Sequence, residues 1–156
     1  MNYESFILDI SLVDGQIHSI SHLSEGNILS VIPRELKKGK RKLYVVTENS
    51  KIVYVGVTIL SLSTRINYGF RANGKKGYHG YKWKVLSKVT MFVFVFENLT
   101  IQEIENIEAE LVYNVREKTG KWPDFQNEIH FNNLYDKGRS VALRIYEQLM
   151  ISLNNK

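Results

Sequence analysis

Hydrophobic and polar residues alternate in the first part of the chain, a pattern typical of strands with one buried face. The alternation covers residues 5–12 and is followed by Asp14-Gly15, a pair that favours a tight two-residue turn. A return strand fits residues 17–20. We therefore predict a β-hairpin over residues 5–20.

Two further strands are predicted at residues 43–47 and 52–57. Both segments are rich in β-branched and aromatic residues, and the four residues between them have turn-forming side chains. A hairpin of this kind places Tyr44 and Tyr54 on neighbouring strands, where two phenols can face one spot. This second hairpin is the part of the chain in which we expect a functional site.

The strongest strand signal covers residues 84–96, whose second half is apolar on both faces, as in a central strand covered by other layers. Phe92, Phe94 and Phe96 share one face of this strand and have no basic residues between them. We therefore interpret them as core residues rather than as a platform on which bases stack.

Helical periodicity appears in three segments of the chain. Ser61 is a suitable N-cap for a short helix that presents Arg65 near the ends of the second hairpin. Thr100, followed by Glu103, fits the capping box of a longer helix. The apolar residues of segment 138–153 fit an amphipathic C-terminal helix, whose simplest role is packing.

One acidic residue interrupts the apolar stripe of the long helix, which runs to about residue 118. On a helical wheel Glu108 falls between Val112 and Val115, whereas Glu110 faces solvent. A carboxylate at such a position costs stability unless it has a partner, so Glu108 is a candidate for a metal-binding or catalytic role. The simpler alternative is an ion-paired glutamate at the edge of the stripe.

The composition excludes several classes of protein. The chain has no cysteine, which excludes disulfides and thiolate metal sites. It has no apolar run of about 18 residues, and its first residues lack the basic and then apolar order of a secretory signal, so we expect no membrane association and a cytoplasmic location. His18 and His22 are four residues apart, but the predicted strand spoils the geometry of a metal pair.

Basic residues concentrate in the middle of the chain. Residues 1–33 contain four acids and no Lys or Arg, residues 34–90 contain fourteen basic residues and two acids, and residues 91–156 contain seven basic residues and ten acids. A basic block between acidic flanks is typical of a protein that holds a polyanion, and we predict a nucleic-acid partner. The alternative is a solvated surface that serves only solubility.

Six basic residues lie within residues 34–42, which we interpret as a phosphate-contacting arm rather than a solvated linker. The first hairpin and this arm form an expected N-terminal extension at residues 1–40, followed by one domain at residues 41–156. The glycine-rich, basic segment 69–80 does not match a P-loop, because its lysines are not followed by Ser or Thr. We predict a loop near the ligand there.

Taken in order, Leu43-Tyr44, Tyr54-Val55-Gly56, Arg65 and the helix bearing Glu108 resemble the motifs of the GIY-YIG nuclease superfamily. The resemblance covers roughly residues 40–130 and rests on the ordered set with its spacings rather than on any single motif. It implies an α+β fold with a small, mainly antiparallel three-stranded sheet flanked by helices. The N-terminal hairpin and the C-terminal helix would be additions to that core.

The resemblance also implies an activity, the hydrolysis of DNA phosphodiester bonds with one divalent cation per site, Mg²⁺ or Mn²⁺. Tyr44 and Tyr54 would be the paired tyrosines, Arg65 the helix arginine and Glu108 the metal ligand. The cation and the Arg65 charge would stabilise the negative charge of the transition state, and a carboxylate suits Mg²⁺. A tyrosine would activate the attacking water, and we favour Tyr44 for that role, with Tyr54 positioning the water or phosphate.

The chain departs from the family's pattern at two positions. Lys42 replaces the glycine of the first motif, and Gly69 stands one helical turn after Arg65, where many members have a histidine. His79, in the glycine-rich loop, is the candidate to supply that histidine's function. Asn127 is the candidate for the late asparagine of some members.

The basic residues around the motifs are the expected DNA contacts: Lys40, Arg41, Lys42, Arg71, Lys75, Lys76 and Lys82. Double-stranded DNA is the predicted partner, and a palindromic target would need two active sites and hence a homodimer. Two alternatives to an enzyme are a nucleic-acid-binding module with the same fold and a scaffold for protein partners built on the acidic N-terminal segment. The presence of all four motif residues favours the enzyme.

Overall fold

The computed structural model describes residues 3–24, 27–29, 36–37, 39–74, 79–127 and 129–154. Its strands are β1 (Tyr3–Val13), β2 (Gln16–Ser24), β3 (Asn27–Leu29), β4 (Arg41–Glu48), β5 (Lys51–Thr58) and β6 (Lys88–Phe96). Its α-helices are α1 (Leu62–Arg71), α2 (Ile101–Thr119) and α3 (Gly138–Asn154), and a short 3₁₀ helix covers Lys82–Val85. The predicted α+β class is confirmed.

The strands form one antiparallel sheet in the order β3-β2-β1-β6-β4-β5. The prediction of three strands is wrong, because five strands of eight to eleven residues and the three-residue β3 share the sheet. The extra strands enter through β1, which pairs with β6 from Tyr3 opposite Phe96 to Ser11 opposite Lys88. The N-terminal hairpin therefore continues the central sheet.

Local turn and cap chemistry explains where most elements begin and end. Asp14 and Gly15 both have positive φ angles, as the predicted two-residue turn between β1 and β2 requires. Ser61 caps α1 by accepting a hydrogen bond from the backbone N–H of Thr64. The predicted capping box of α2 is present, and Gly120, in the left-handed region, ends that helix.

The central strand is β6, which pairs with β1 on one side and β4 on the other. It begins at Lys88, later than the predicted start at residue 84, because the chain forms the 3₁₀ helix there and buries Trp83 completely. From Met91 to Phe96 every side chain is buried, which confirms that the phenylalanines of this strand are core residues.

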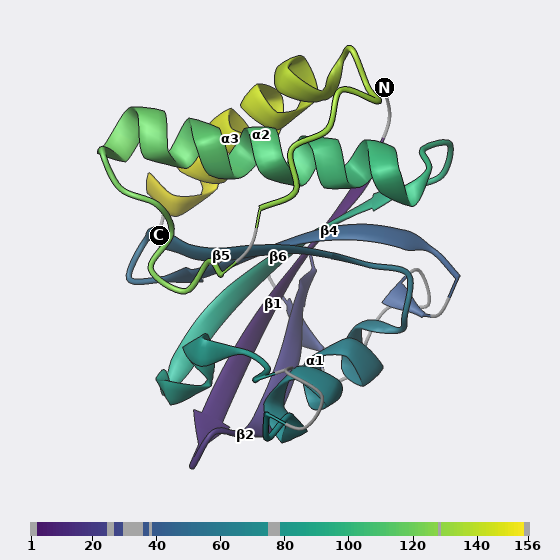
Figure 1. Cartoon of the computed structure of the whole chain (residues 1–156). Coiled ribbons are helices and arrows are strands. Elements are labelled where there is room, and N and C mark those ends of the chain that lie inside the picture. The colour runs from purple at the N-terminus through teal and green to yellow at the C-terminus, as the bar shows by residue number, and fades with distance from the viewer. Residues whose placement is uncertain are drawn as a thin grey trace.

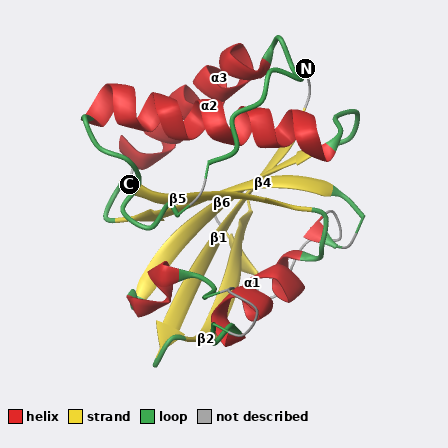
Figure 2. Ribbon diagram, in the orientation of Figure 1, coloured by secondary structure: helices red, strands yellow, loops and turns green. Residues whose placement is uncertain are grey.

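The helices cover both faces of the sheet (Figures 1 and 2). One core lies between the sheet and helices α2 and α3, and includes Phe94, Leu111 and Ile145. The other core lies on the opposite face, where Tyr44 and Trp83 pack with residues of α1. Within the described residues no helix is long and apolar enough to cross a bilayer.

Strand β5 lies at one end of the sheet and pairs with β4 on one side only. The chain after α2 covers part of its other side. The backbone N–H of Phe125 donates to the carbonyl of Val53, and the backbone N–H of Val55 donates to the side-chain oxygen of Gln126. Beyond this cover, at Gly56, elements from both faces of the sheet meet around the strand's edge.

Candidate active site

The two tyrosines of the second hairpin lie together, as predicted. Tyr44 on β4 is paired with Gly56 on β5, and Tyr54 stands two residues before that glycine, so both phenols share one face of the sheet. Their ring centroids are 6.1 Å apart. A Cβ at Gly56 would lie 2.5 Å from the Tyr44 hydroxyl, so the glycine leaves the space that the Tyr44 side chain fills.

Helix α1 brings Arg65 to the same pair of rings. The Nε of Arg65 donates to the Tyr44 hydroxyl oxygen at 3.4 Å, and the guanidinium carbon lies 5.7 Å from the centre of the Tyr81 ring. The Tyr44 hydroxyl is also hydrogen-bonded to the Tyr81 hydroxyl at 2.7 Å. Three phenols and one guanidinium thus form a compact group beside β5.

A cavity of about 460 Å³ opens at this point of the β5 edge. Arg65 reaches it from α1 on one face of the sheet, and Glu108 reaches it from α2 on the other. The other side chains that line the cavity are those of Tyr54, Val57, His79, Tyr81, Lys82, Glu105, Gln126, Asn127 and His130. Three of the four motif residues therefore face one space, and the fourth, Tyr44, lies directly behind Gly56 in its wall.

The electrostatics of the cavity raise the pKa of Glu108 to about 8. Burial is the main cause, and the neighbouring charge of Glu105 adds to it, whereas the positive charge of Arg65 acts in the opposite direction. Carboxylates whose environment disfavours their charge cluster at functional sites, because structural positions rarely retain them. The position of Glu108 in the apolar stripe, which the sequence singled out, is therefore one where the folded chain disfavours a negative charge.

The tyrosines differ in their access to the cavity. Tyr44 is fully buried, whereas Tyr54 is partly exposed and lines the cavity. Burial, followed by the proximity of Tyr44 and Glu108, raises the pKa of Tyr54 well above its ordinary value, and Arg65 offsets part of that rise. Burial likewise raises the pKa of Tyr81, so both of these phenols keep their protons at neutral pH.

The carboxylates of the cavity fit a hydrated divalent cation. Glu105 and Glu108 are three residues apart on α2, which puts them on neighbouring positions of one helical face. Mg²⁺ usually keeps several water ligands and is bound through one or two carboxylates. Burial and the charge of Glu105 disfavour the charged form of Glu108 more than Arg65 favours it, and a bound cation would favour that form. Within the described residues, no group of three or more Asp, Glu or His side chains is arranged to hold a metal.

The predicted DNA contacts and auxiliary residues have mixed positions. His79, Lys82 and Asn127 line the cavity. Arg71 is exposed in the last turn of α1, and Arg41 is half-buried at the start of β4. The Lys40 ammonium forms an exposed ion pair with Glu97 at 3.3 Å. Lys75 and Lys76 lie outside the described residues.

Lys42 is in a different position from the one expected of a DNA contact. Its side chain is fully buried, and its ammonium donates to the backbone carbonyls of Lys37 and Lys40. Burial lowers the pKa of Lys42 to about 8. The ammonium thus holds the backbone just before β4 through these two carbonyls.

Replacing Lys42 by methionine is expected to leave DNA affinity unchanged and to alter only stability. The folded protein releases this proton near pH 8, whereas the unfolded chain holds it to about pH 10.5, so wild-type stability rises with pH across that window. Lys42→Met should abolish this rise, as thermal unfolding between pH 7 and 10 would show. A tenfold or greater loss of DNA affinity in Lys42→Met would show that Lys42 contacts DNA, as the sequence predicted.

Sequence reasoning missed Tyr81, Glu105, Gln126 and His130, which all line the cavity. Glu105 could have been found, because it lies one helical turn before Glu108 on the same face. Tyr81 had no local signal, since its place depends on the packing of residues 79–82 against α1. Gln126 also had no local signal, because it contacts the edge of β5 through Val55, which is 71 residues away in the sequence.

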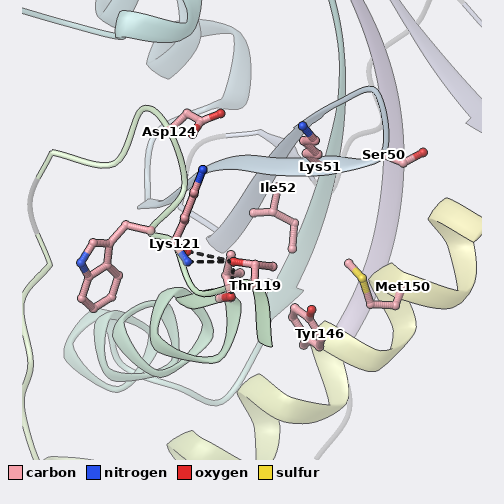
Figure 3. A pocket seen from close by; sticks show the side chains of 10 residues that line it. Ser50, Lys51, Ile52, Thr119, Lys121, Asp124, Tyr146 and Met150 are labelled. Atoms are coloured by element: carbon pink, nitrogen blue, oxygen red, sulfur yellow. Dashed lines mark hydrogen bonds between the residues drawn. The ribbon is translucent and has the colours of Figure 1, made fainter. Parts of the chain in front are cut away.

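A second cavity, of about 430 Å³, lies between the start of β5, the end of α2 and α3 (Figure 3). Its lining includes Lys51, Lys121 and Asp124 together with the apolar side chains of Ile52 and Met150. None of the predicted site residues lines this cavity. We therefore place the candidate active site in the cavity at Gly56.

Comparison of the chain with models of protein families, with curated proteins and with solved structures gives no match. The interpretation of the site therefore rests on its own geometry. In that geometry a guanidinium, a carboxylate and a tyrosine line one cavity, and a second tyrosine is hydrogen-bonded to the guanidinium.

Proposed function

We propose that the protein is a metal-dependent endonuclease of the GIY-YIG type, which hydrolyses phosphodiester bonds of DNA. One observation carries the proposal. Tyr54, Arg65 and Glu108 come from three different elements and line one cavity, and Tyr44 is hydrogen-bonded to Arg65 in its wall. These are the four residues that the ordered motifs single out, and only the tertiary fold brings Arg65 and Glu108 to the tyrosine hairpin.

The charges of the cavity suit a phosphodiester. The Arg65 guanidinium offers several N–H donors in a fixed plane, which match the oxygens of a phosphate and stabilise the charge that accumulates in the transition state. Lys82 lies on the same cavity and adds a second positive charge. A divalent cation held by Glu108, with Glu105 beside it, would supply further positive charge at the phosphate and lower the pKa of a nearby water or phenol.

The burial of the tyrosines favours a different division of labour from the one we expected. Tyr54 lines the cavity, so it is the phenol that can contact an attacking water. Tyr44 has no exposed surface, and its oxygen accepts a hydrogen bond from Arg65. We assign the positioning of the attacking water to Tyr54, which would act as its base only where a bound cation lowers the raised pKa of this phenol. We assign the orientation of the guanidinium to Tyr44.

Purified protein incubated with supercoiled plasmid and with phage DNA tests this function. Nicked or linear products are expected in Mg²⁺ or Mn²⁺ and none in EDTA. Affinity should fall steeply between about 50 and 200 mM salt, because phosphate contacts release counterions. DNA binding without cleavage in every metal tested would favour a nucleic-acid-binding module over an enzyme. An absence of DNA binding at low salt would contradict both functions.

A further inference from the structure

Tyr81 is the residue of the cavity that connects most of the others. It lies just before the 3₁₀ helix, and its side chain is only 2% exposed. Its ring stacks on Trp83 with centroids 5.0 Å apart and meets the edge of Tyr54 at 5.4 Å. Its hydroxyl is 2.7 Å from that of Tyr44, and its ring lies beneath Arg65.

Two glycines make room for Tyr81 against helix α1. A Cβ at Gly69 would lie 2.2 Å from two carbons of the Tyr81 ring, so no other residue fits there without moving the ring. A Cβ at Gly80 would lie 2.0 Å from the Gly69 carbonyl oxygen, and Gly80 has a φ of +71°. The backbone N–H of Tyr81 donates to that same carbonyl at 3.1 Å.

Gly69 lies four residues after Arg65, so the two share one face of α1. The space that a side chain at position 69 would occupy is filled instead by the ring of Tyr81, reaching in from another part of the chain. His79, which we expected to compensate for Gly69, is exposed and lines the cavity. The Tyr81 ring therefore fills the space next to Arg65 on this face of α1.

The directions of the hydrogen bonds show what Tyr81 does to Tyr44. A guanidinium can only donate, so the Tyr44 oxygen accepts from Arg65. Tyr81 keeps its proton because burial raises its pKa, and it can donate that proton to the same oxygen. With Tyr81 as the donor, two hydrogen bonds would converge on the Tyr44 oxygen and fix its position. The Tyr81 ring lies under the guanidinium.

We propose that Tyr81 is a positioning residue of the nuclease site, which holds the Tyr44 hydroxyl and the Arg65 guanidinium in the orientation that meets the phosphate. This inference rests on the proposed function. Tyr81 acts through its two neighbours and does not itself exchange a proton with substrate. The fold arrangement that permits it is the close approach of Gly80 and Gly69.

The test compares Tyr81→Phe, which removes one oxygen and keeps the ring, with Tyr113→Phe, a control at an exposed phenol of α2. In single-turnover cleavage, Tyr81→Phe should reduce the rate about 10- to 100-fold while DNA affinity stays within about twofold. Tyr113→Phe should match the wild type. Thermal unfolding of each variant verifies that the fold is retained.

A double-mutant cycle separates positioning from a general structural effect. In a Tyr44→Phe background the partner of the hydrogen bond is already absent, so adding Tyr81→Phe should cost less than about threefold. Additive losses, or a Tyr81→Phe rate within twofold of the wild type, would overturn the role of Tyr81 and leave the nuclease proposal standing. Absence of cleavage by the unmodified protein in every metal would overturn both.

Discussion

Replacing Glu108 by glutamine is expected to reduce DNA cleavage by about 10³-fold or more and, in the absence of metal, to stabilise the fold above about pH 8. Glutamine keeps the size of the side chain but has no negative charge with which to hold a cation. The loss of activity would then accompany a gain of stability, a combination that misfolding cannot produce. Single-turnover cleavage and thermal unfolding of the same preparation measure the two effects.

The sign of the stability effect follows from the raised pKa of Glu108, about 8 compared with an ordinary value of 4.5. Between these pH values the unfolded chain releases the proton while the folded protein keeps it, so stability falls as pH rises through the window. Because the side chain is partly exposed, we expect a gain on the order of 2 kcal/mol for the glutamine variant above pH 8, a few degrees in Tm. At pH 4 the difference should vanish.

Lys118→Ala is the matched control for Glu108→Gln, since it removes an exposed charge ten residues further along the same helix. It should preserve both cleavage and the pH dependence of stability. A Glu108→Gln variant that cleaves at the wild-type rate would remove Glu108 from the site. A variant that shows no pH-dependent gain in stability would contradict the raised pKa of Glu108.

Replacing Arg65 by alanine is expected to slow cleavage by about 10³-fold, because a fixed charge opposite the phosphate acts mainly in the transition state. DNA affinity should fall far less, by less than about tenfold, since the rest of the basic surface remains. Lysine at this position restores the charge but cannot reproduce the Nε contact with Tyr44, so Arg65→Lys should recover only part of the rate.

Arg71→Ala provides a comparison within the same helix. Arg71 is exposed in the last turn of α1, and as a DNA contact it should affect affinity and its salt dependence, with the rate on bound DNA preserved. Arg65→Ala should show the opposite division between rate and affinity. If Arg65→Ala instead loses DNA affinity and keeps its cleavage rate on bound DNA, as expected for Arg71→Ala, then Arg65 is a surface contact and the site assignment is wrong.

The parts of the fold that were predictable depend on near neighbours in sequence. The Asp14-Gly15 turn, the N-cap at Ser61 and the capping box at Thr100 are chemical signals that a few residues carry. The size of the sheet was not predictable, because alternation shows that β1 has a buried face but does not identify its partner. The pairing of β1 with β6 joins segments at opposite ends of the first hundred residues.

The same distinction holds in the candidate site. The predicted hairpin placed Tyr44 and Tyr54 on neighbouring strands, but only the register shift between Val46 and Thr47, which the sequence did not show, brings both phenols to one face. Glu108 was singled out because helical periodicity is local. Tyr81 is 37 residues from Tyr44, and its position depends on close packing between two glycines. The burial of Lys42 was not predictable, because charge alone does not distinguish a surface lysine from one whose ammonium is bound to backbone carbonyls.

The central claim is that Glu108 holds a divalent cation opposite Arg65, at the edge of β5, where DNA is cleaved. Titration of Mn²⁺ into the protein with a DNA duplex bound, followed by electron paramagnetic resonance at pH 8.5, tests it most directly. We predict one Mn²⁺ per chain in the wild type and in Lys118→Ala, and loss of that ion in Glu108→Gln. Equal Mn²⁺ binding by the wild type and Glu108→Gln would contradict the account.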